Sequence, residues 1–183
     1  MAKVIRVKNG GLAGLLMRLE ELEKTKLKIG VFESAKYEDG TPVAGVAAVQ
    51  ELGSPKLGIP PRPFFRTTAE EKKGEWGNLF ERASKAIIEG KISPYDAMDR
   101  IGLQVAGQIK TTITNIQSPP LSPVTLHLRK LKQQGETITG SIVAGVKQKA
   151  AKGEELDTSG VSTKPLVDDA ILLNSITHEV EES

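Results

Sequence analysis

The chain of 183 residues contains no cysteine, which excludes disulfide bonds and thiolate metal sites. Aromatic residues make up only 4% of the sequence and hydrophobic residues 38%. This predicts a modest core, with loops or arms that contain too little apolar surface to fold alone. Neither sign of charge dominates, because 25 Lys and Arg face 23 Asp and Glu, for a net charge of +2. No strong overall field draws the chain to nucleic acid or to anionic lipid.

Long apolar runs are also missing. No stretch approaches the roughly 18 apolar residues that a membrane-spanning helix needs. Residues 1–6 lack the apolar region of a signal peptide. We therefore expect no membrane partner and a protein that is cytoplasmic when made. The length suits one core domain, with or without an appendage.

No residue set typical of catalysis is apparent. The serines lack the surroundings of a nucleophile elbow, and Gly10-Gly11 with Gly14 is not a phosphate-binding loop. A metal site can be drawn on paper from Asp168, Asp169, His178 and Glu179. Their spacing matches no known ligand motif, and an acid pair at a helix start plus an ordinary strand histidine explains them as well. We predict no catalytic residue, no metal and no cofactor.

Two longer helices are predicted, each from apolar residues at spacings of three and four. The first spans residues 67–90, where Thr67 and Glu70 look like a capping box and Gly90 like a stop. The second spans residues 93–116, and Ser93 followed by Pro94 is its start signal. Shorter helices are expected over residues 12–22, 42–50 and 122–132.

Two segments alternate in polarity as half-buried strands do. Residues 26–32 place Leu27, Ile29 and Val31 on one face, and residues 175–181 repeat this pattern from Ile176 onward. A third short strand is expected at residues 4–7. Together the elements predict an α+β fold, in which a small, mostly antiparallel sheet is packed by the two longer helices.

Residues 135–163 look least like core. The β-type residues between 137 and 146 are interrupted by Gly140 and Gly145, and residues 147–160 are charged, small and poor in apolar groups. We predict a mobile, extended arm or β-hairpin here. It would be inserted between a core domain at residues 1–134 and a C-terminal strand segment at residues 164–183 that completes the core.

Basic residues make nucleic-acid binding the main alternative to protein–protein interaction. They lie in two groups, on the expected helix at 122–132 and in the arm: Arg129, Lys130, Lys132, Lys147, Lys149 and Lys152. Such a set could contact phosphates without sequence preference. No aromatic residues for base stacking are interleaved with them, and a solvated helix face and loop explain the same pattern.

A stiff proline segment is the strongest sign of an interaction protein. Pro60, Pro61 and Pro63 fix φ at about −65° and bias the residues before them to extended backbone. We expect a non-helical segment that presents Phe64 and Phe65 on opposite sides, one in the core and one toward a partner; both rings packing in the core is the alternative. The candidate interface residues lie here, in the arm and in an aspartate pair: Pro61, Arg62, Pro63, Phe64, Phe65, Arg66, Lys147, Lys149, Lys152, Asp168 and Asp169.

Several of these segments resemble motifs of the tail-completion and neck proteins of long-tailed double-stranded DNA bacteriophages. The family's E-x-G and P-x-R-P-F-h-R match residues 51–53 and 60–66, and P-L-S-P-x-T matches residues 120–125. Its K-P-L-h-D-T-G-x-L-x-x-S-I matches residues 164–176, except that Asp169 and Ala170 replace Thr-Gly. The resemblance runs in order over roughly residues 26–180, with the arm as an insertion.

The resemblance implies a structural virion protein with a tail-terminator-like fold. It would form a ring, expected to hold six copies, in the neck of the virion after assembly in the host cytoplasm. Its partners would be further copies of itself, a head-closure or connector protein, and the tail tube or tail terminator protein. DNA in the lumen would be contacted weakly and without sequence preference. A tail terminator that caps tube polymerisation, or a non-specific DNA-binding packaging accessory, is the alternative.

Overall fold

The computed structural model describes residues 11–167 and 170–182. The α-helices in these residues are α1 (Gly11–Lys24), α2 (Val43–Leu52), α3 (Phe64–Ile88), α4 (Pro94–Asn115), α5 (Pro123–Gln133), α6 (Gly140–Ala151) and α7 (Ile171–Ser175). A 3-10 turn (Pro55–Leu57) and two strands, β1 (Thr25–Val31) and β2 (Ile176–Glu182), complete the set. The strand expected at residues 4–7 lies outside the described residues.

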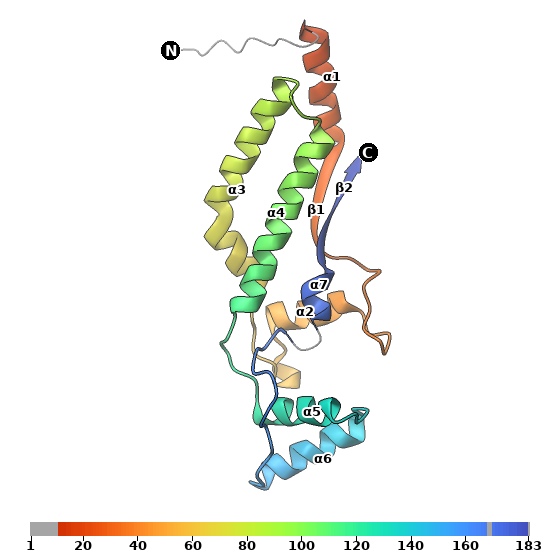
Figure 1. Ribbon diagram of the computed structural model, residues 1–183, viewed down its shortest axis with the longest axis vertical. Coiled ribbons are helices and arrows are strands. Elements are labelled where there is room, and N and C mark those ends of the chain that lie inside the picture. Colours follow the sequence, from red (N-terminus) through yellow and green to blue (C-terminus); the bar gives the residue numbers. More distant parts are fainter. Residues whose placement is uncertain (1–10, 168–169, 183) are drawn as a thin grey trace.

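The molecule is elongated (Figure 1). α1 stands at one end, α5 and α6 lie at the other, and α3, α4 and the two strands run between them. This is the small α+β fold that the sequence predicts, with α3 and α4 as its two longer helices, of 25 and 22 residues. None of the helices in the described residues is long and apolar enough to cross a membrane.

The two strands pair antiparallel and join segments from opposite ends of the chain. The register runs from Thr25 opposite Glu182 to Val31 opposite Ile176. The predicted alternation is confirmed, because Leu27 and Ile29 are half-buried whereas Lys26 and Lys28 are exposed. On the outer face Lys28 Nζ donates to Glu181 Oε1 at 2.6 Å. The inner face of the sheet packs on α4.

The central helix, α4, forms most of the core. Its buried apolar residues recur along one stripe: Met98, Ile101, Val105, Ile109 and Ile113. The predicted start signal is confirmed, since Ser93 Oγ accepts a hydrogen bond from Asp96 N at 3.0 Å and Pro94 follows as the first helical residue. Gly102 lets the sheet approach, because a Cβ there would lie 2.4 Å from the His178 ring.

The start of α3 corrects the sequence prediction. The helix begins at Phe64, so Phe64 and Phe65 lie in its first turn rather than in an extended segment, and Thr67 is not its cap. A proline restricts its own φ and the residue before it, so Pro63 is compatible with a helix that starts directly after it. In the predicted apolar stripe of α3, Ile87 is buried but Phe80 is exposed.

The predicted extended arm or β-hairpin is wrong, because residues 140–151 form α6. Thr139 is its N-cap, accepting a hydrogen bond from Ile142 N at 3.4 Å. Val146 is buried, and α6 packs against α5. The spacing of Ile142, Val143 and Val146 suits a helix facing α5 as well as a strand, and the packing between the two helices decides in favour of the helix.

Candidate functional site

A group of polar side chains ties the motif segments together where α2 meets the start of α3. We call Gln50, Glu51, Arg62, Arg66 and the carbonyls of Pro119 and Pro120 the motif junction. Its members come from segments that match three different parts of the motif pattern or flank them directly. The hydrogen bonds from Arg62 to the carbonyls of Pro119 and Pro120 join residues far apart in sequence. The other hydrogen bonds of the junction lie within residues 50–66.

Glu51 caps α3 from the last turn of α2. Its Oε2 accepts a hydrogen bond from Phe65 N at 2.9 Å, and its Oε1 accepts one from Arg66 N at 3.1 Å. Arg66 reaches back, donating from Nε to Glu51 Oε1 at 3.0 Å and from Nη2 to the Glu51 carbonyl at 2.8 Å. Glu51 is only 9% exposed. A carboxylate at a helix N-terminus satisfies free N–H groups and suits the helix dipole.

Arg62 is the second buried member, with 3% of its surface exposed. Its Nε donates to the Pro119 carbonyl at 3.0 Å, Nη2 to the Pro120 carbonyl at 3.2 Å, and Nη1 to Gln50 Oε1 at 3.0 Å. Burial, followed by the nearby Arg129 cation, lowers the pKa of Arg62. The guanidinium therefore joins α2 to the segment that leads from α4 into α5, as a structural link rather than an exposed contact.

Gly53 makes the turn that carries the chain from α2 into the proline segment. Its φ is 77°, in the left-handed region that favours glycine. A Cβ at this position would also lie 2.8 Å from Pro61 N. Both facts account for the glycine of the E-x-G motif. The glutamate of the same motif is Glu51, so the motif encodes a turn together with a long-range helix cap.

Neither phenylalanine of the proline segment projects into solvent. Phe64 is fully buried, and Phe65 is half-buried against the core, with ring centroids 4.9 Å apart. Phe65 lies over β1, where its Cζ would be 3.9 Å from a Cβ on Gly30. The prediction that one ring lies in the core is confirmed by Phe64. Phe65 is only half-buried, so its contact with a partner stays a prediction beside the alternative that both rings pack in the core.

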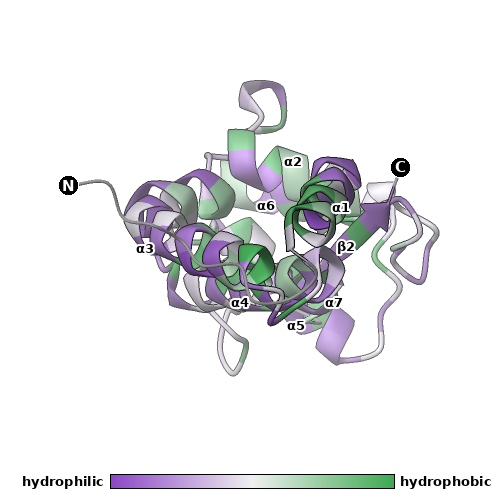
Figure 2. Cartoon of the chain, turned by 90° about the horizontal axis from the view of Figure 1, so that it is seen from above, coloured by the Kyte–Doolittle hydropathy of each residue, from purple (hydrophilic) through white to green (hydrophobic). Residues whose placement is uncertain are grey.

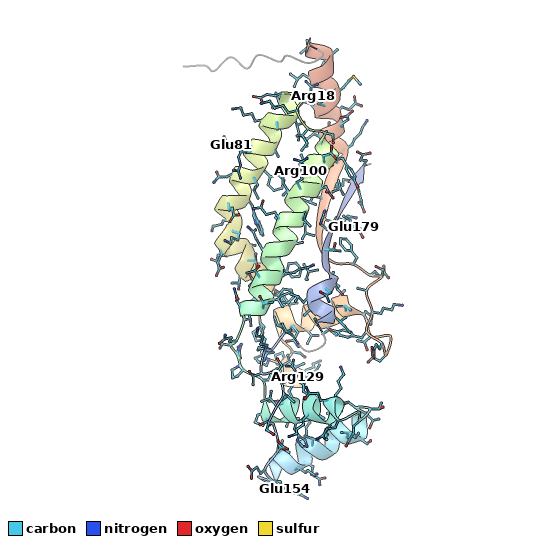
Figure 3. The ribbon with its side chains drawn as sticks, viewed as in Figure 1. Arg18, Glu81, Arg100, Arg129, Glu154 and Glu179 are labelled. Atoms are coloured by element: carbon cyan, nitrogen blue, oxygen red, sulfur yellow. The ribbon has the colours of Figure 1, made fainter. Side chains whose placement is uncertain are left out.

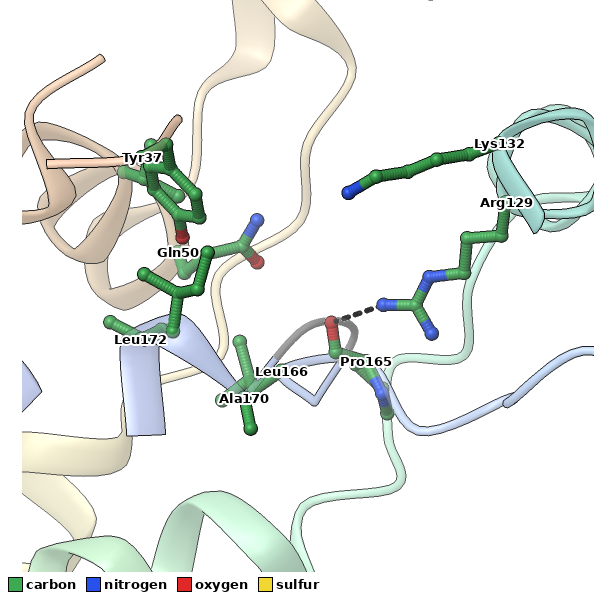
Figure 4. Close-up of a pocket in the computed structure, with 10 residues that line it drawn as sticks. Tyr37, Gln50, Arg129, Lys132, Pro165, Leu166, Ala170 and Leu172 are labelled. Carbon is green, nitrogen blue, oxygen red and sulfur yellow. Dashed lines mark hydrogen bonds between the residues drawn. The ribbon is translucent and has the colours of Figure 1, made fainter. Parts of the chain in front are cut away.

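The two later motif segments are joined by α5. Ser122 Oγ accepts a hydrogen bond from Thr125 N at 3.2 Å and caps the helix, which explains the S-P-x-T spacing. Arg129 then donates to the carbonyls of Ser162 at 2.7 Å, Lys164 at 2.9 Å and Pro165 at 3.4 Å. Figure 4 shows the last of these bonds. The K-P-L segment is thereby held against α5.

A cavity of about 260 Å³ opens beside the motif junction (Figure 4). Tyr37, Gln50, Arg129 and Lys132 give it polar groups, and Leu166 and Leu172 lie among its apolar walls. Arg129 is committed to backbone carbonyls, so the cavity is a structural gap between elements more than a site built for an anion. The candidate residues Asp168 and Asp169 lie outside the described residues.

The other predicted interface residues are not brought to the junction. Lys147, Lys149 and Lys152 are exposed, on α6 and at its C-terminal cap. Residues 147–160 do not form the extended arm that the sequence predicts, because α6 continues to Ala151 and Asp157 anchors the segment after it. Asp157 accepts hydrogen bonds from Lys130 Nζ and Ser159, and His127 Nδ1 lies 2.8 Å from its carbonyl. Lys130 therefore has a structural role rather than a free basic charge.

Glu51 and Gln50 are the functional residues that sequence reasoning missed as site residues. The signal was present in the E-x-G motif, which marks Glu51 but does not reveal which backbone groups it binds. In the part of the chain that the structure describes, no group of three or more His, Asp or Glu could hold a metal ion.

A second surface stands apart from the junction. Leu12, Leu16 and Leu19 form one row along α1 and are 73%, 57% and 41% exposed. We call them the α1 stripe. Figure 2, which views the molecule end-on, shows both hydrophobic and hydrophilic residues along α1. An exposed row of leucines is typical of a surface that another protein covers.

Comparisons with known proteins give no relative. No protein-family model matches the chain, and no curated protein or solved structure matches it either.

Proposed function

We propose that the protein is a structural component of the virion neck. It forms a ring at the head–tail junction of a long-tailed bacteriophage and joins the tail tube to the head connector. The observation that carries the proposal is the motif junction. Segments from residue 51 to residue 166 that resemble the tail-completion family are linked by the capping hydrogen bonds of Glu51 and by those of buried Arg62. Beside the junction, the more exposed hydrogen bonds of Arg129 add the last of these segments.

Two further features support an assembly role. The α1 stripe offers apolar surface that a neighbouring subunit would cover, as ring-forming proteins require. The net charge of +2 suits a protein beside a DNA channel, because a strongly basic lumen would retain the phosphates of a passing genome.

The test is disruption of the gene in the phage that carries it, followed by electron microscopy of the lysate. The proposal predicts filled heads and tails of normal length that remain separate. Adding the purified chain to that lysate should restore joined particles. Joined particles in the absence of the chain would contradict the proposal.

The same experiment separates the alternatives. A tail terminator would leave tails of abnormal length when it is missing, because nothing would cap the polymerising tube. A DNA-packaging accessory would leave empty heads. An antibody against the chain, detected with gold on intact virions, should label the neck and not the tail tip.

A further inference from the structure

An apolar groove runs between the upper halves of α3 and α4. It holds about 230 Å³, and its floor consists mainly of small or buried apolar side chains: Leu79, Ala83, Ala86, Ala97 and Ile101. Arg82 and Arg100 line its edges. Figure 3 places Arg100 on the half of α4 nearest α1. α1 contributes no residue to the lining, so within the described residues of one copy the groove and the α1 stripe are both left exposed.

The stripe and the groove match in length and in shape. Leu12 and Leu19 are seven residues apart in α1, as are Leu79 and Ala86 in α3, so each spans about 10 Å at 1.5 Å per residue. The alanines of the groove leave depth for larger side chains, and the stripe supplies three leucines. Ridges of large residues on one helix pack into grooves of this kind between others.

The charges beside the two surfaces are complementary. Glu20 and Glu23 are exposed next to the end of the stripe, since Glu23 lies four positions after Leu19 on the same side of α1. Glu20 already pairs with Lys24 at 2.8 Å, so Glu23 is the main acidic group offered to a partner here. Across the described residues, neither Arg82 nor Arg100 makes a hydrogen bond or an ion pair through its side chain. Arginines at the edge of an apolar groove are suited to carboxylates from a bound helix.

From this match we infer that α1 of one copy docks into the α3–α4 groove of a second copy. In the structure, α1 does not enter the groove of its own chain. Arg18 Nη2 donates to the Ile88 carbonyl at 3.1 Å, and Leu22 packs against the core, which holds α1 over the end of the α3–α4 pair. The interface joins two different patches, so each copy can bind one neighbour on either side. The inference depends on the proposed function in one respect, namely that this head-to-tail series of copies closes into a ring.

Because the chain contains no cysteine, disulfides can form only between cysteines that are introduced for the test. Leu16→Cys and Ala83→Cys are made in separate full-length copies, mixed and oxidised. The expected result is a mixed dimer, because docking would bring the two Cα atoms within the roughly 7 Å that a disulfide allows. Ala86→Cys serves as a second groove position. Met17→Cys is the matched control, since Met17 is 63% exposed but lies on another side of α1.

A charge exchange tests the same interface independently. Arg82→Glu with Arg100→Glu in the groove copy should abolish the mixed disulfide. Glu20→Lys with Glu23→Lys in the stripe copy should restore it.

Three outcomes would overturn the inference: disulfides between two Leu16→Cys copies, which would indicate a symmetric pairing of stripes; equal cross-linking by Met17→Cys; or no mixed dimer at the highest protein concentration attainable. Each is independent of the neck assignment, which depends on the fate of heads and tails. If the antibody labels the neck but no mixed dimer forms, the proposed function still holds and only this interface is excluded.

Discussion

The carboxylate of Glu51 caps the N-terminus of α3, the longest helix in the described residues. Glu51→Ala would leave the Phe65 and Arg66 amides without their acceptor. We expect a loss of about 2–4 kcal/mol in the free energy of unfolding, because losing a cap costs about 0.5–2 kcal/mol and an unsatisfied buried donor about 1–3. Urea unfolding measures it. Glu70→Ala, an exposed change in the same helix, is the control and should stay within about 0.5 kcal/mol of the original chain.

The two neighbouring phenylalanines should differ in degree rather than in kind. Phe64 is fully buried, so Phe64→Ala should cost about 3–5 kcal/mol. Phe65 is half-buried, and part of its packing is with the Phe64 ring, so Phe65→Ala should cost less, about 1–3 kcal/mol. Thermal unfolding of both variants checks the order. An unchanged melting temperature for Phe65→Ala would instead favour the view that this ring serves a partner.

At the scale of helices and strands, local signals predicted some elements well. α4 carries its own cap in Ser93 and Pro94 and its own apolar stripe, and β1 and β2 alternate in polarity, so neighbouring residues determine them. The start of α3 depends on Glu51, thirteen residues earlier than the first helical residue. α6 depends on packing against α5. The apolar spacing within α6 suits a strand as well as a helix, and no pattern within α3 reveals the cap that Glu51 supplies, so contacts outside each segment decide its structure.

The site was predictable to a similar degree. The resemblance marked the segments of the motif junction, and Arg62 was named from the sequence. The role of Arg62 was not predicted. An exposed contact was expected, whereas its guanidinium is buried and bound to Gln50, Pro119 and Pro120. A proline segment that positions a buried arginine has the same local sequence as one that presents it to a partner. Only the distant carbonyls distinguish the two cases.

The packing between α4 and the sheet depends on Gly102. A methyl group there would lie 2.4 Å from His178 Cδ2 and 2.8 Å from Leu27 Cδ1, so Gly102→Ala must displace these side chains or move the sheet away from the helix. We expect a loss of about 1–3 kcal/mol in the free energy of unfolding. Gly107→Ala in the same helix is the control. It meets open space and should stabilise the protein by about 0.5–1 kcal/mol, because alanine is the better helix former.

The anchor of the segment after α6 should depend on pH only in strong acid. Hydrogen bonds from Lys130 and then from Ser159 hold the pKa of Asp157 well below its ordinary value of 3.8. A depressed carboxyl pKa stabilises the folded state above the unfolded value, and this contribution is lost as the pH falls through the folded pKa. The anchor is therefore complete at about pH 5 to 7, an ordinary range for folded proteins.

A carbon-13 NMR titration of the Asp157 carboxyl measures this directly. Its midpoint should lie below 3.8 in the original chain. Lys130→Gln should move the midpoint upward, but not fully to the ordinary value, because the Ser159 hydrogen bonds remain. A midpoint that Lys130→Gln leaves unchanged would show that the ion pair does not hold the segment in solution.

The whole molecule carries different surfaces at its two ends. α1 presents leucines at one end, and α6 with its cap presents Lys147, Lys149 and Lys152 at the other. The motif junction lies between them and holds the intervening elements in fixed positions. An elongated chain of this kind is compatible with the proposed neck role, in which one end would bind a neighbouring copy and the other would be available to a different partner.

Those three lysines make DNA binding the sharpest test at the scale of the whole protein. We expect weak binding of duplex DNA at physiological salt, because the net charge is +2 and Lys130 of the neighbouring helix is paired with Asp157. Any residual binding should fall when all three lysines are changed to glutamine. The dependence of that binding on salt should then become shallower, by about one released counterion for each lysine that no longer neutralises a phosphate. A mobility-shift titration at several salt concentrations measures both.

Changing three exposed lysines elsewhere, Lys56, Lys73 and Lys85, is the matched control for charge. Tight binding that disappears only with the α6 lysines would favour the packaging-accessory alternative over a neck ring through which DNA passes.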